Sequence, residues 1–240
     1  MSSQFQLDGI KIEIADAPEL KFPGDQTGGT DCNSPLWWRQ GNIHVLNSTG
    51  HPFRSFGPDV EHLGPSAPVT YTSPRAGGRW IESVHQETGG LLYGWYHYEP
   101  TDLIPEEVQT GRPNRLTAPS IGAVVSRDNG VTWDDQGILI SGGPDTLNYD
   151  TVNYYFAGGN GDFSVILDRK GEYFYFVMGT YYKDVSQQGI ALARMRFADR
   201  ADPVGKVMKW RGGAWQEPGL GGAVTPILPA VSDWNGPRPD

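Results

Sequence analysis

Three carboxylates stand at comparable places along the chain, each at the entrance of a predicted strand and each followed closely by a serine. They are Asp31, Glu82 and Asp162. Two carboxyl groups that share a site can do acid–base chemistry, because one stays protonated and donates to a leaving oxygen while the other, ionised, activates water or attacks carbon. This chemistry cleaves glycosidic bonds, so the three acids are the candidate catalytic residues. The alternative is that each caps a strand or binds turn amides.

Period-two apolar runs bounded by turn residues predict the strands that position these acids. One set of four strands covers residues 81–84, 91–98, 120–126 and 137–140, and a second set covers 163–167, 173–181, 189–197 and 207–210. A weaker set precedes them at 35–38, 42–47 and 53–56. The 32 Gly, 19 Pro, 8 Trp and 11 Tyr fit many turns joined to aromatic-rich strands and make long helices unexpected.

A four-stranded unit that recurs three times predicts an all-β propeller, in which each sheet is a blade packed against the next around a channel. Residues 223–229 are expected to start a fourth blade, so the propeller domain, 28–240, is expected to be an incomplete fragment, preceded by an N-terminal extension, 1–27. Because first strands line the axis, the three acids are expected to meet at one mouth of the channel. The insertions at 100–116 and 141–153 are expected to rim one face.

The segment 126–133 resembles the Asp-box hairpin of sialidases and other propellers, Ser-x-Asp-x-Gly-x-Thr-Trp, at all five defining positions. Asp128 is expected to bond backbone amides of the turn, Gly130 to adopt a positive φ and Trp133 to pack against neighbouring strands. The motif therefore indicates a β-hairpin and gives Asp128 a structural role instead of a catalytic one.

The layout of blades and acids resembles the five-bladed β-propeller glycosidases, the family 43 and family 32 clan of arabinanases, xylosidases and invertases, over about residues 28–230. The Ala-Pro strand entry in 117–122 is similar to one in the same clan. The resemblance implies a glycoside hydrolase of polysaccharides or oligosaccharides, with Asp31 as base, Glu82 as the residue that tunes the site and Asp162 as acid. The second and third acids, Glu and Asp, reverse the clan's usual Asp and Glu.

Four further residues are candidates for substrate binding: Asn33, Trp37, His97 and Glu99. Trp37 belongs to a group of aromatic residues for which packing between blades is the first interpretation, and sugar contact is the alternative. Glu99 ends an apolar strand before an insertion and is a reserve acid or a rim residue. His97 is a hydrogen-bond donor to sugar or a metal ligand, but no close zinc-type spacing of His, Asp or Glu occurs, so neither a catalytic metal nor a cofactor is predicted. The glycines of 158–161 give Asp162 a flexible approach to the axis.

The charge and hydropathy of the chain argue against two classes of partner, nucleic acid and the membrane interior, and the carbohydrate partner is what the resemblance implies. Its formal net charge is −9 and its basic residues are scattered, which argues against nucleic acid and favours a neutral or cationic ligand. No stretch approaches the roughly 20 apolar residues of a membrane span, and the first residues lack the pattern of a signal peptide. The single cysteine, Cys32, excludes an internal disulfide and does not determine the redox compartment. The sequence also leaves the localisation and the oligomeric state open.

Two other functions fit the same sequence. One is a propeller that binds carbohydrate without cleaving it, since a fold does not imply chemistry. The other is a sialidase-like exo-glycosidase, which needs a cluster of arginines for the substrate carboxylate. The candidate arginines are more numerous than such a site requires: Arg39, Arg54, Arg79, Arg112, Arg115 and Arg194.

Overall fold

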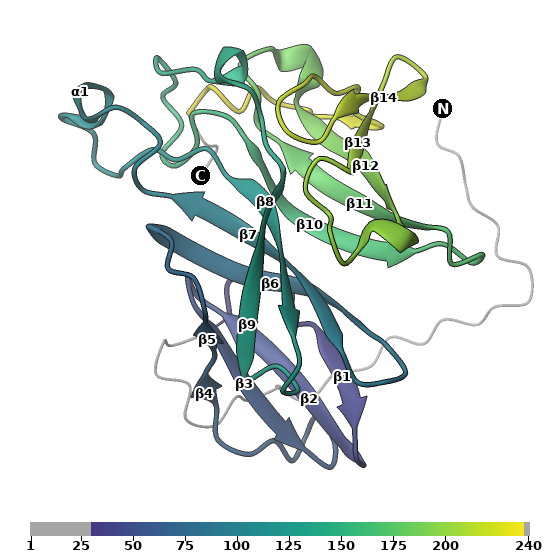
Figure 1. Ribbon diagram of the computed structural model, residues 1–240. Helices are drawn as coiled ribbons and strands as arrows, with labels where there is room; N and C mark the ends of the chain where they lie inside the picture. Colours follow the sequence, from purple (N-terminus) through teal and green to yellow (C-terminus); the bar gives the residue numbers. More distant parts are fainter. Residues whose placement is uncertain (1–29, 238–240) are drawn as a thin grey trace, which may run out of the picture.

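The computed structural model describes residues 30–237, and the expected N-terminal extension lies outside the described residues. The described chain forms three β-sheets (Figure 1). The first sheet has the order β1 Leu36–Arg39, β2 Asn42–Ser48, β3 Pro52–Gly57 and β4 Ala67–Pro68. The second sheet runs from β6 Gly77–Gln86 through β7 Leu92–Pro100 and β8 Ser120–Ser126 to β9 Thr132–Ile140, with β5 Thr70–Tyr71 added parallel to β9.

The third sheet contains β10 Asn160–Leu167, β11 Tyr173–Thr180, β12 Gly189–Arg196, β13 Met208–Arg211 and β14 Ala214–Pro218, and β15 Leu228–Pro229 pairs with β12. Helix is confined to α1 Glu106–Gln109 and three 3₁₀ turns in the described chain, η1 Pro144–Thr146, η2 Val185–Gln187 and η3 Phe197–Asp199. The predicted all-β fold with four-stranded propeller blades is confirmed, because the main strands of each sheet pair antiparallel with their neighbours in sequence.

The segment 223–229, where the sequence predicts the start of a fourth blade, is tied to the third sheet. The two residues of β15 pair with the start of β12, in the register Gly189↔Pro229. Gly189 has a φ of +132°, and a Cβ there would lie 2.2 Å from the carbonyl oxygen of Leu228. The close approach that glycine allows therefore returns this segment to the third sheet. The sequence also missed β14, although the two glycines Gly212 and Gly213 mark its hairpin with β13.

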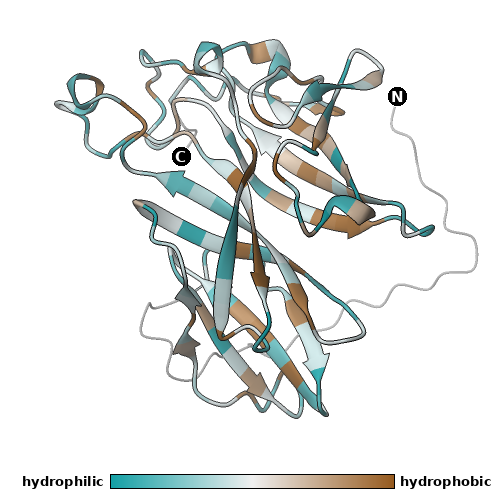
Figure 2. Ribbon diagram, in the orientation of Figure 1, coloured by the Kyte–Doolittle hydropathy of each residue, from teal (hydrophilic) through white to brown (hydrophobic). Residues whose placement is uncertain are grey.

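Two apolar clusters hold the sheets together. The larger lies between the second and third sheets and includes Trp95, Phe174 and Phe176. The other lies between the first and second sheets and includes Trp37 and Trp133. Apolar residues lie on strands of all three sheets (Figure 2). Burial between neighbouring blades thus fixes the relative positions of their first strands, and β6 contacts both β2 and β10.

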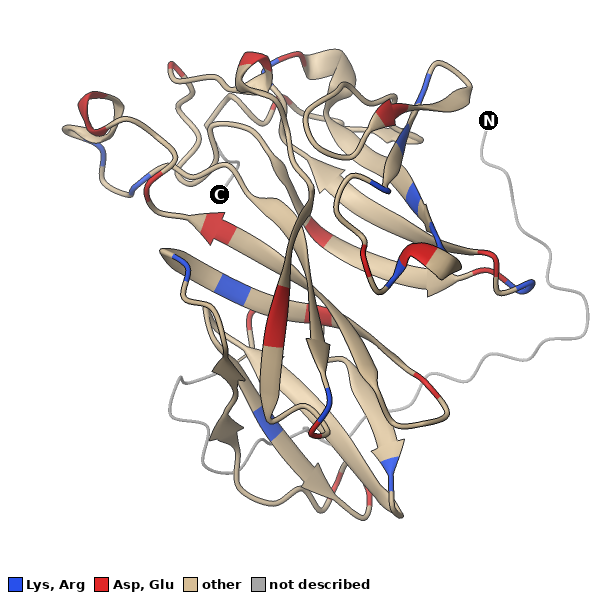
Figure 3. Ribbon diagram, in the orientation of Figure 1, with Lys and Arg blue, Asp and Glu red and all other residues tan. Residues whose placement is uncertain are grey.

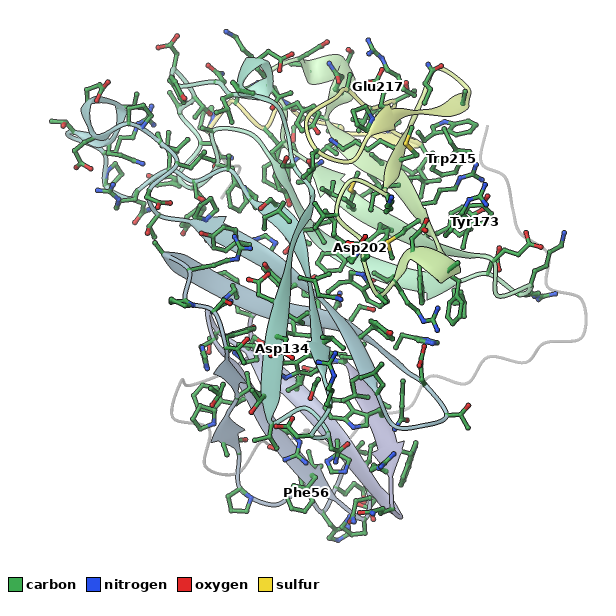
Figure 4. The ribbon with its side chains drawn as sticks, in the orientation of Figure 1. Phe56, Asp134, Tyr173, Asp202, Trp215 and Glu217 are labelled. Carbon is green, nitrogen blue, oxygen red and sulfur yellow. The ribbon has the colours of Figure 1, made fainter. Side chains whose placement is uncertain are left out.

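Aromatic residues also cover the outer face of the third sheet. Tyr173 and Trp215 lie near each other at its edge (Figure 4), and the guanidinium of Arg194 lies 4.4 Å from the Tyr173 ring centroid and 4.6 Å from that of Trp215. Such stacking buries the apolar parts of all three side chains and adds a cation–π attraction.

The hairpin between β8 and β9 has the Asp-box geometry that the sequence predicts. Asp128 Oδ1 accepts the backbone N–H of Thr132 at 2.8 Å and that of Val131 at 3.2 Å, as well as the Ser126 hydroxyl at 2.9 Å. Gly130 has a φ of +82°. The carboxylate of Asp128 lies in the turn and accepts the hydrogen bonds that the sequence predicts for it.

We expect Asp128→Ala to lower the free energy of unfolding by about 1–2 kcal/mol, because three donors lose their charged acceptor at a surface turn. The control is Asp134→Ala in the same hairpin, where an exposed carboxylate is paired only with exposed Arg127 and the expected loss is about 0.5 kcal/mol or less. Urea unfolding of both variants measures the difference, and equal losses would contradict the structural role of Asp128.

The two insertions lie together, as predicted. Arg112 of the first donates to the carbonyl oxygens of Tyr149 at 2.6 Å and Thr151 at 2.9 Å, both in the second. This contact joins loops that are far apart in the sequence into one rim. Among the described residues, the chain forms no helix with the length and apolar character to cross a bilayer.

Candidate active site

The three candidate acids line one cavity of about 370 Å³, a size within the range of about 300–1,000 Å³ for small-molecule sites. Asp31 precedes β1, Glu82 lies in β6 and Asp162 lies in β10. Acidic positions on β6, β7 and β10 are visible in Figure 3. The remaining lining residues are mostly aromatic or polar: Trp80, His97, Glu99, Asn153, Tyr155, Phe156, Tyr181 and Trp234. The three acids that the sequence selects come from separate parts of the chain, and the structure brings them together in one cavity.

Glu82 and Asp162 both stand at β-bulges. The pairing of β6 with β7 shifts register between Ile81 and Ser83, which leaves Glu82 as the extra residue. The pairing of β10 with β11 shifts in the same way around Asp162. A bulge bends its strand and re-aims the side chain of the extra residue. Both acids are therefore turned out of the regular alternation of their strands, and Glu82 lies in the middle of β6 instead of at a strand entrance as the sequence predicts.

The backbone around Asp162 is held by side chains of the second sheet. Asp162 has a φ of +40°, a conformation uncommon outside glycine. Its N–H donates to His97 Nδ1 at 3.2 Å, and the N–H of Phe163 donates to Glu82 Oε2 at 3.0 Å. A Cβ on Gly161 would lie 2.5 Å from His97 Cε1. Glycine at 161 thus permits the histidine ring to approach the bulge closely.

Burial governs the ionisation of Glu82, whose side chain is 2% exposed. Burial raises the pKa of Glu82 to about 7, although the Phe163 amide and His97 act to lower it, and the charges of Asp162 and Asp31 raise it further. The Asp162 side chain is 78% exposed. The site therefore contains one carboxyl group that keeps its proton well above the usual range for a glutamate, beside one that is open to a ligand.

The hydroxyl group of Tyr181 and the imidazole of His97 also contribute to the polar part of the cavity. The Tyr181 hydroxyl donates to Asp162 Oδ2 at 3.4 Å, and burial raises the pKa of Tyr181, which keeps it a donor. His97 Nε2 lies 3.2 Å from Glu99 Oε1. Burial alone would lower the pKa of His97, but the Glu99 hydrogen bond and the charges of Glu82 and Asp162 give a net rise.

Glu82, His97 and Asp162 are also the one group in the described residues whose possible metal-ligand atoms lie together, all within 4.8 Å of one another. The sequence offered no close spacing of such residues, because sheets that are far apart in the chain supply them. In this structure His97 Nδ1 accepts the Asp162 amide and Glu82 Oε2 accepts the Phe163 amide. These atoms therefore serve the β10 bulge, and the prediction of a site without a metal stays a prediction.

Aromatic rings form one wall of the cavity, and sequence reasoning missed most of them. Phe156 and Tyr181 are stacked with centroids 4.8 Å apart, and Trp234 meets Tyr181 edge-on at 4.8 Å. The side chain of Asn153 donates to the Trp234 carbonyl at 2.9 Å and fixes that segment. Phe156 and Trp234 lie in loops without periodicity, and Tyr181 directly follows β11, so the sequence carried no signal of their convergence beyond the presence of the insertion itself.

Two of the four predicted substrate-binding residues, His97 and Glu99, line the cavity, and two do not. Trp37 is 4% exposed in the core between the first and second sheets, and its indole N–H donates to Asn129 Oδ1 at 2.7 Å. Packing is thus its role, as the first interpretation held. Asn33 is outside the lining and donates to the carbonyl of Phe163 at 2.8 Å, where it ties the first sheet to β10.

No family model and no curated protein matches the chain. Among solved structures, the arabinanase of Bacillus subtilis is similar at 14% identity, with a TM-score of 0.47 over 80% of this chain and 60% of that one. The α-L-arabinofuranosidase of Fusarium graminearum is similar at 12% identity, with a TM-score of 0.48 over 80% of this chain and 53% of that one. An N-acetylgalactosamine deacetylase from F. plautii is similar at 12% identity, with a TM-score of 0.44 over 72% and 54%.

β-Propeller glycosidases are thus among the structures that resemble the chain in part. The chain spans between 53% and 60% of the length of the three structures named. At these identities and TM-scores, the likeness assigns no activity to the chain.

Proposed function

We propose that this chain is a glycoside hydrolase that acts on a polysaccharide or oligosaccharide by paired-carboxylate chemistry. The observation that carries the proposal is the meeting of Asp31, Glu82 and Asp162 in one cavity, with carboxylate oxygens of Glu82 and Asp162 within 4.8 Å of each other. Glycoside hydrolysis needs one protonated and one ionised carboxyl group on either side of the scissile bond. The raised pKa of Glu82 supports its assignment as the protonated group.

Glu82 and Asp162 form a carboxyl pair in which burial favours the proton on Glu82. Two carboxylates at this separation resist simultaneous ionisation, and the buried position of Glu82 strengthens the effect. The exposed Asp162 is the member of the pair that can reach the glycosidic oxygen, and the buried Glu82 keeps the proton available to it. Asp31 is exposed and lines the cavity, and it is the proposed base that activates water.

The wall of Phe156, Tyr181 and Trp234 is the proposed sugar-binding surface. Aromatic rings pack against the apolar C–H faces of sugars while neighbouring polar groups bind the hydroxyls. Arginine and lysine are missing from the described lining of the cavity. A sialidase-like site, which needs arginines for the substrate carboxylate, is therefore not supported, and a neutral sugar fits the surrounding acids better.

A panel of aryl glycosides that differ in sugar and anomeric configuration tests the proposal. We expect turnover of at least one member by the wild-type chain, and its loss in both Asp31→Asn and Asp162→Asn. Asp134→Asn, outside the cavity, is the matched control and should retain the wild-type rate. Binding of sugars without turnover of any aryl glycoside would favour the carbohydrate-binding module instead.

The rate is expected to fall as the pH rises above about 7. The raised pKa of Glu82 means that the pair keeps its proton below that pH and loses it above. The pH profile of kcat/KM for the aryl glycoside measures this alkaline limb. Glu82→Gln should move the limb, because its amide cannot ionise, and an unchanged limb in that variant would assign the titration to another group.

A further inference from the structure

The left-handed backbone at Asp162 depends on a hydrogen-bond acceptor from another sheet. Asp162 is the extra residue of the β10 bulge, so its N–H has no place in the regular ladder with β11. That N–H donates to His97 Nδ1, at 3.2 Å. His97 projects from β7 in the second sheet, where its ring is buried with a 5% exposed side chain and meets Trp80 edge-on at 5.3 Å between centroids.

An acceptor role fixes the chemical form of the imidazole. Nδ1 accepts a hydrogen bond only when it carries no proton, so the neutral ring must carry its proton on Nε2. Nε2 lies 3.2 Å from Glu99 Oε1, which accepts that N–H. The hydrogen bond at one ring nitrogen thereby selects the tautomer that is needed at the other.

We propose that His97 is a positioning residue that holds the Asp162 carboxylate in its working orientation through the Asp162 backbone, and that Glu99 acts through His97 by fixing the ring tautomer. This inference rests on the proposed function for its kinetic consequence only. The chain of contacts runs from Glu99 through the His97 ring to the Asp162 amide, and Asp162 Oδ1 itself lies 3.8 Å from His97 Nδ1.

The predicted kinetic effect lies in kcat more than in KM, because a displaced Asp162 still leaves the aromatic wall intact. A misplacement of about 1 Å at a reacting group costs about 10²-fold in rate. The role also predicts an acid limb in the pH profile, since a proton on Nδ1 removes the acceptor. The titratable groups that face the ring are Glu82 from β6, Glu99 from β7 and Asp162 from β10.

His97→Phe and His97→Asn separate positioning from packing. Phe keeps a ring but has no acceptor, and we expect kcat to fall by about 10²-fold. Asn places an amide oxygen near the position of Nδ1, and we expect it to recover most of the lost rate and to shift the acid limb to lower pH, because Asn does not titrate. Equal rates in the two variants would overturn the proposal.

Substitutions of Glu99 are tested in the wild-type chain and in the His97→Asn variant. Glu99→Leu removes the acceptor of the Nε2 proton and should lower kcat, and Glu99→Gln, which keeps an oxygen acceptor, should lower it less. In the His97→Asn background the Leu substitution should have no further effect, because there is no tautomer left to fix. An undiminished effect of Glu99→Leu in that background would assign Glu99 a role independent of His97.

A measurement of the tautomer distinguishes this inference from the proposed function. Long-range ¹H–¹⁵N NMR of the whole chain, at a pH above the raised pKa of His97, should show the neutral ring with Nε2 protonated and Nδ1 free, and Glu99→Leu should disturb that state. Failure of the wild-type chain to hydrolyse any glycoside would defeat the proposed function and leave this result unaffected. A neutral His97 ring with its proton on Nδ1 would overturn the positioning role whatever the activity.

Discussion

An Asp162→Asn variant is expected to lose about 10²–10⁴-fold in kcat, the usual contribution of a general acid. The side chain keeps its size and its place on the β10 bulge but cannot donate the proton that the leaving oxygen needs. KM should change much less, since Asp162 is one of many groups that line the cavity. Steady-state kinetics on the aryl glycoside that the wild type cleaves best, with equal amounts of folded protein, measure both constants.

The dependence of this loss on the leaving group tests the role of Asp162 as the acid. The loss should be smaller with an aryl leaving group of low pKa, because such a group departs with little help from an acid. Asp31→Asn, which removes the proposed base, should not show this dependence on the leaving group. Wild-type kcat in Asp162→Asn with every substrate would remove Asp162 from the mechanism.

The second large effect is on stability, at the core between the first two sheets. Trp133→Ala is expected to lower the free energy of unfolding by about 3–5 kcal/mol, the range for truncation of a buried Trp. Trp133 is 0% exposed, and its indole N–H donates to the Gly130 carbonyl at 3.1 Å. The ring lies 3.0 Å from the position that a Cβ on Gly94 would take, so it packs directly over the backbone of β7.

Trp38→Ala is the matched control for this prediction, since Trp38 is 55% exposed on β1 and its loss should cost about 1 kcal/mol or less. Urea unfolding followed by circular dichroism compares the two variants. A loss of about 3–5 kcal/mol is a large fraction of the stability of a typical domain. Similar losses in both variants would mean that the Asp-box tryptophan does not anchor the hairpin to the core.

Local patterns in the sequence predict most of the fold, because a period of two and the turn residues act within a few positions. The strand β8 has the bounds predicted for 120–126, and the Asp-box predicts the hairpin that follows it. The repeated placement of acids near first strands predicts that Asp31, Glu82 and Asp162 meet. The first two inferences rest on residues that are close in the sequence, and the third rests on the geometry of a propeller, whose first strands line the axis.

The parts that the sequence does not reveal depend on contacts between distant segments. Trp234 and Tyr181 come together across 53 positions of the chain, and nothing in either segment marks the pair. The bulges at Glu82 and Asp162 arise from the register between strands and have no local pattern. Trp37 is an aromatic residue of the type that can bind a sugar, and only its burial shows that it belongs to the core.

The central claim is that separate blades bring a buried glutamic acid and an exposed aspartate into one proton-sharing pair. A ¹³C NMR titration of the Glu82 carboxyl group in the wild type and in Asp162→Asn tests it most directly. The account predicts a Glu82 pKa of about 7 in the wild type and a lower pKa in the variant, because a like charge has been removed. A Glu82 pKa near the ordinary 4.5 that does not respond to Asp162→Asn would contradict it.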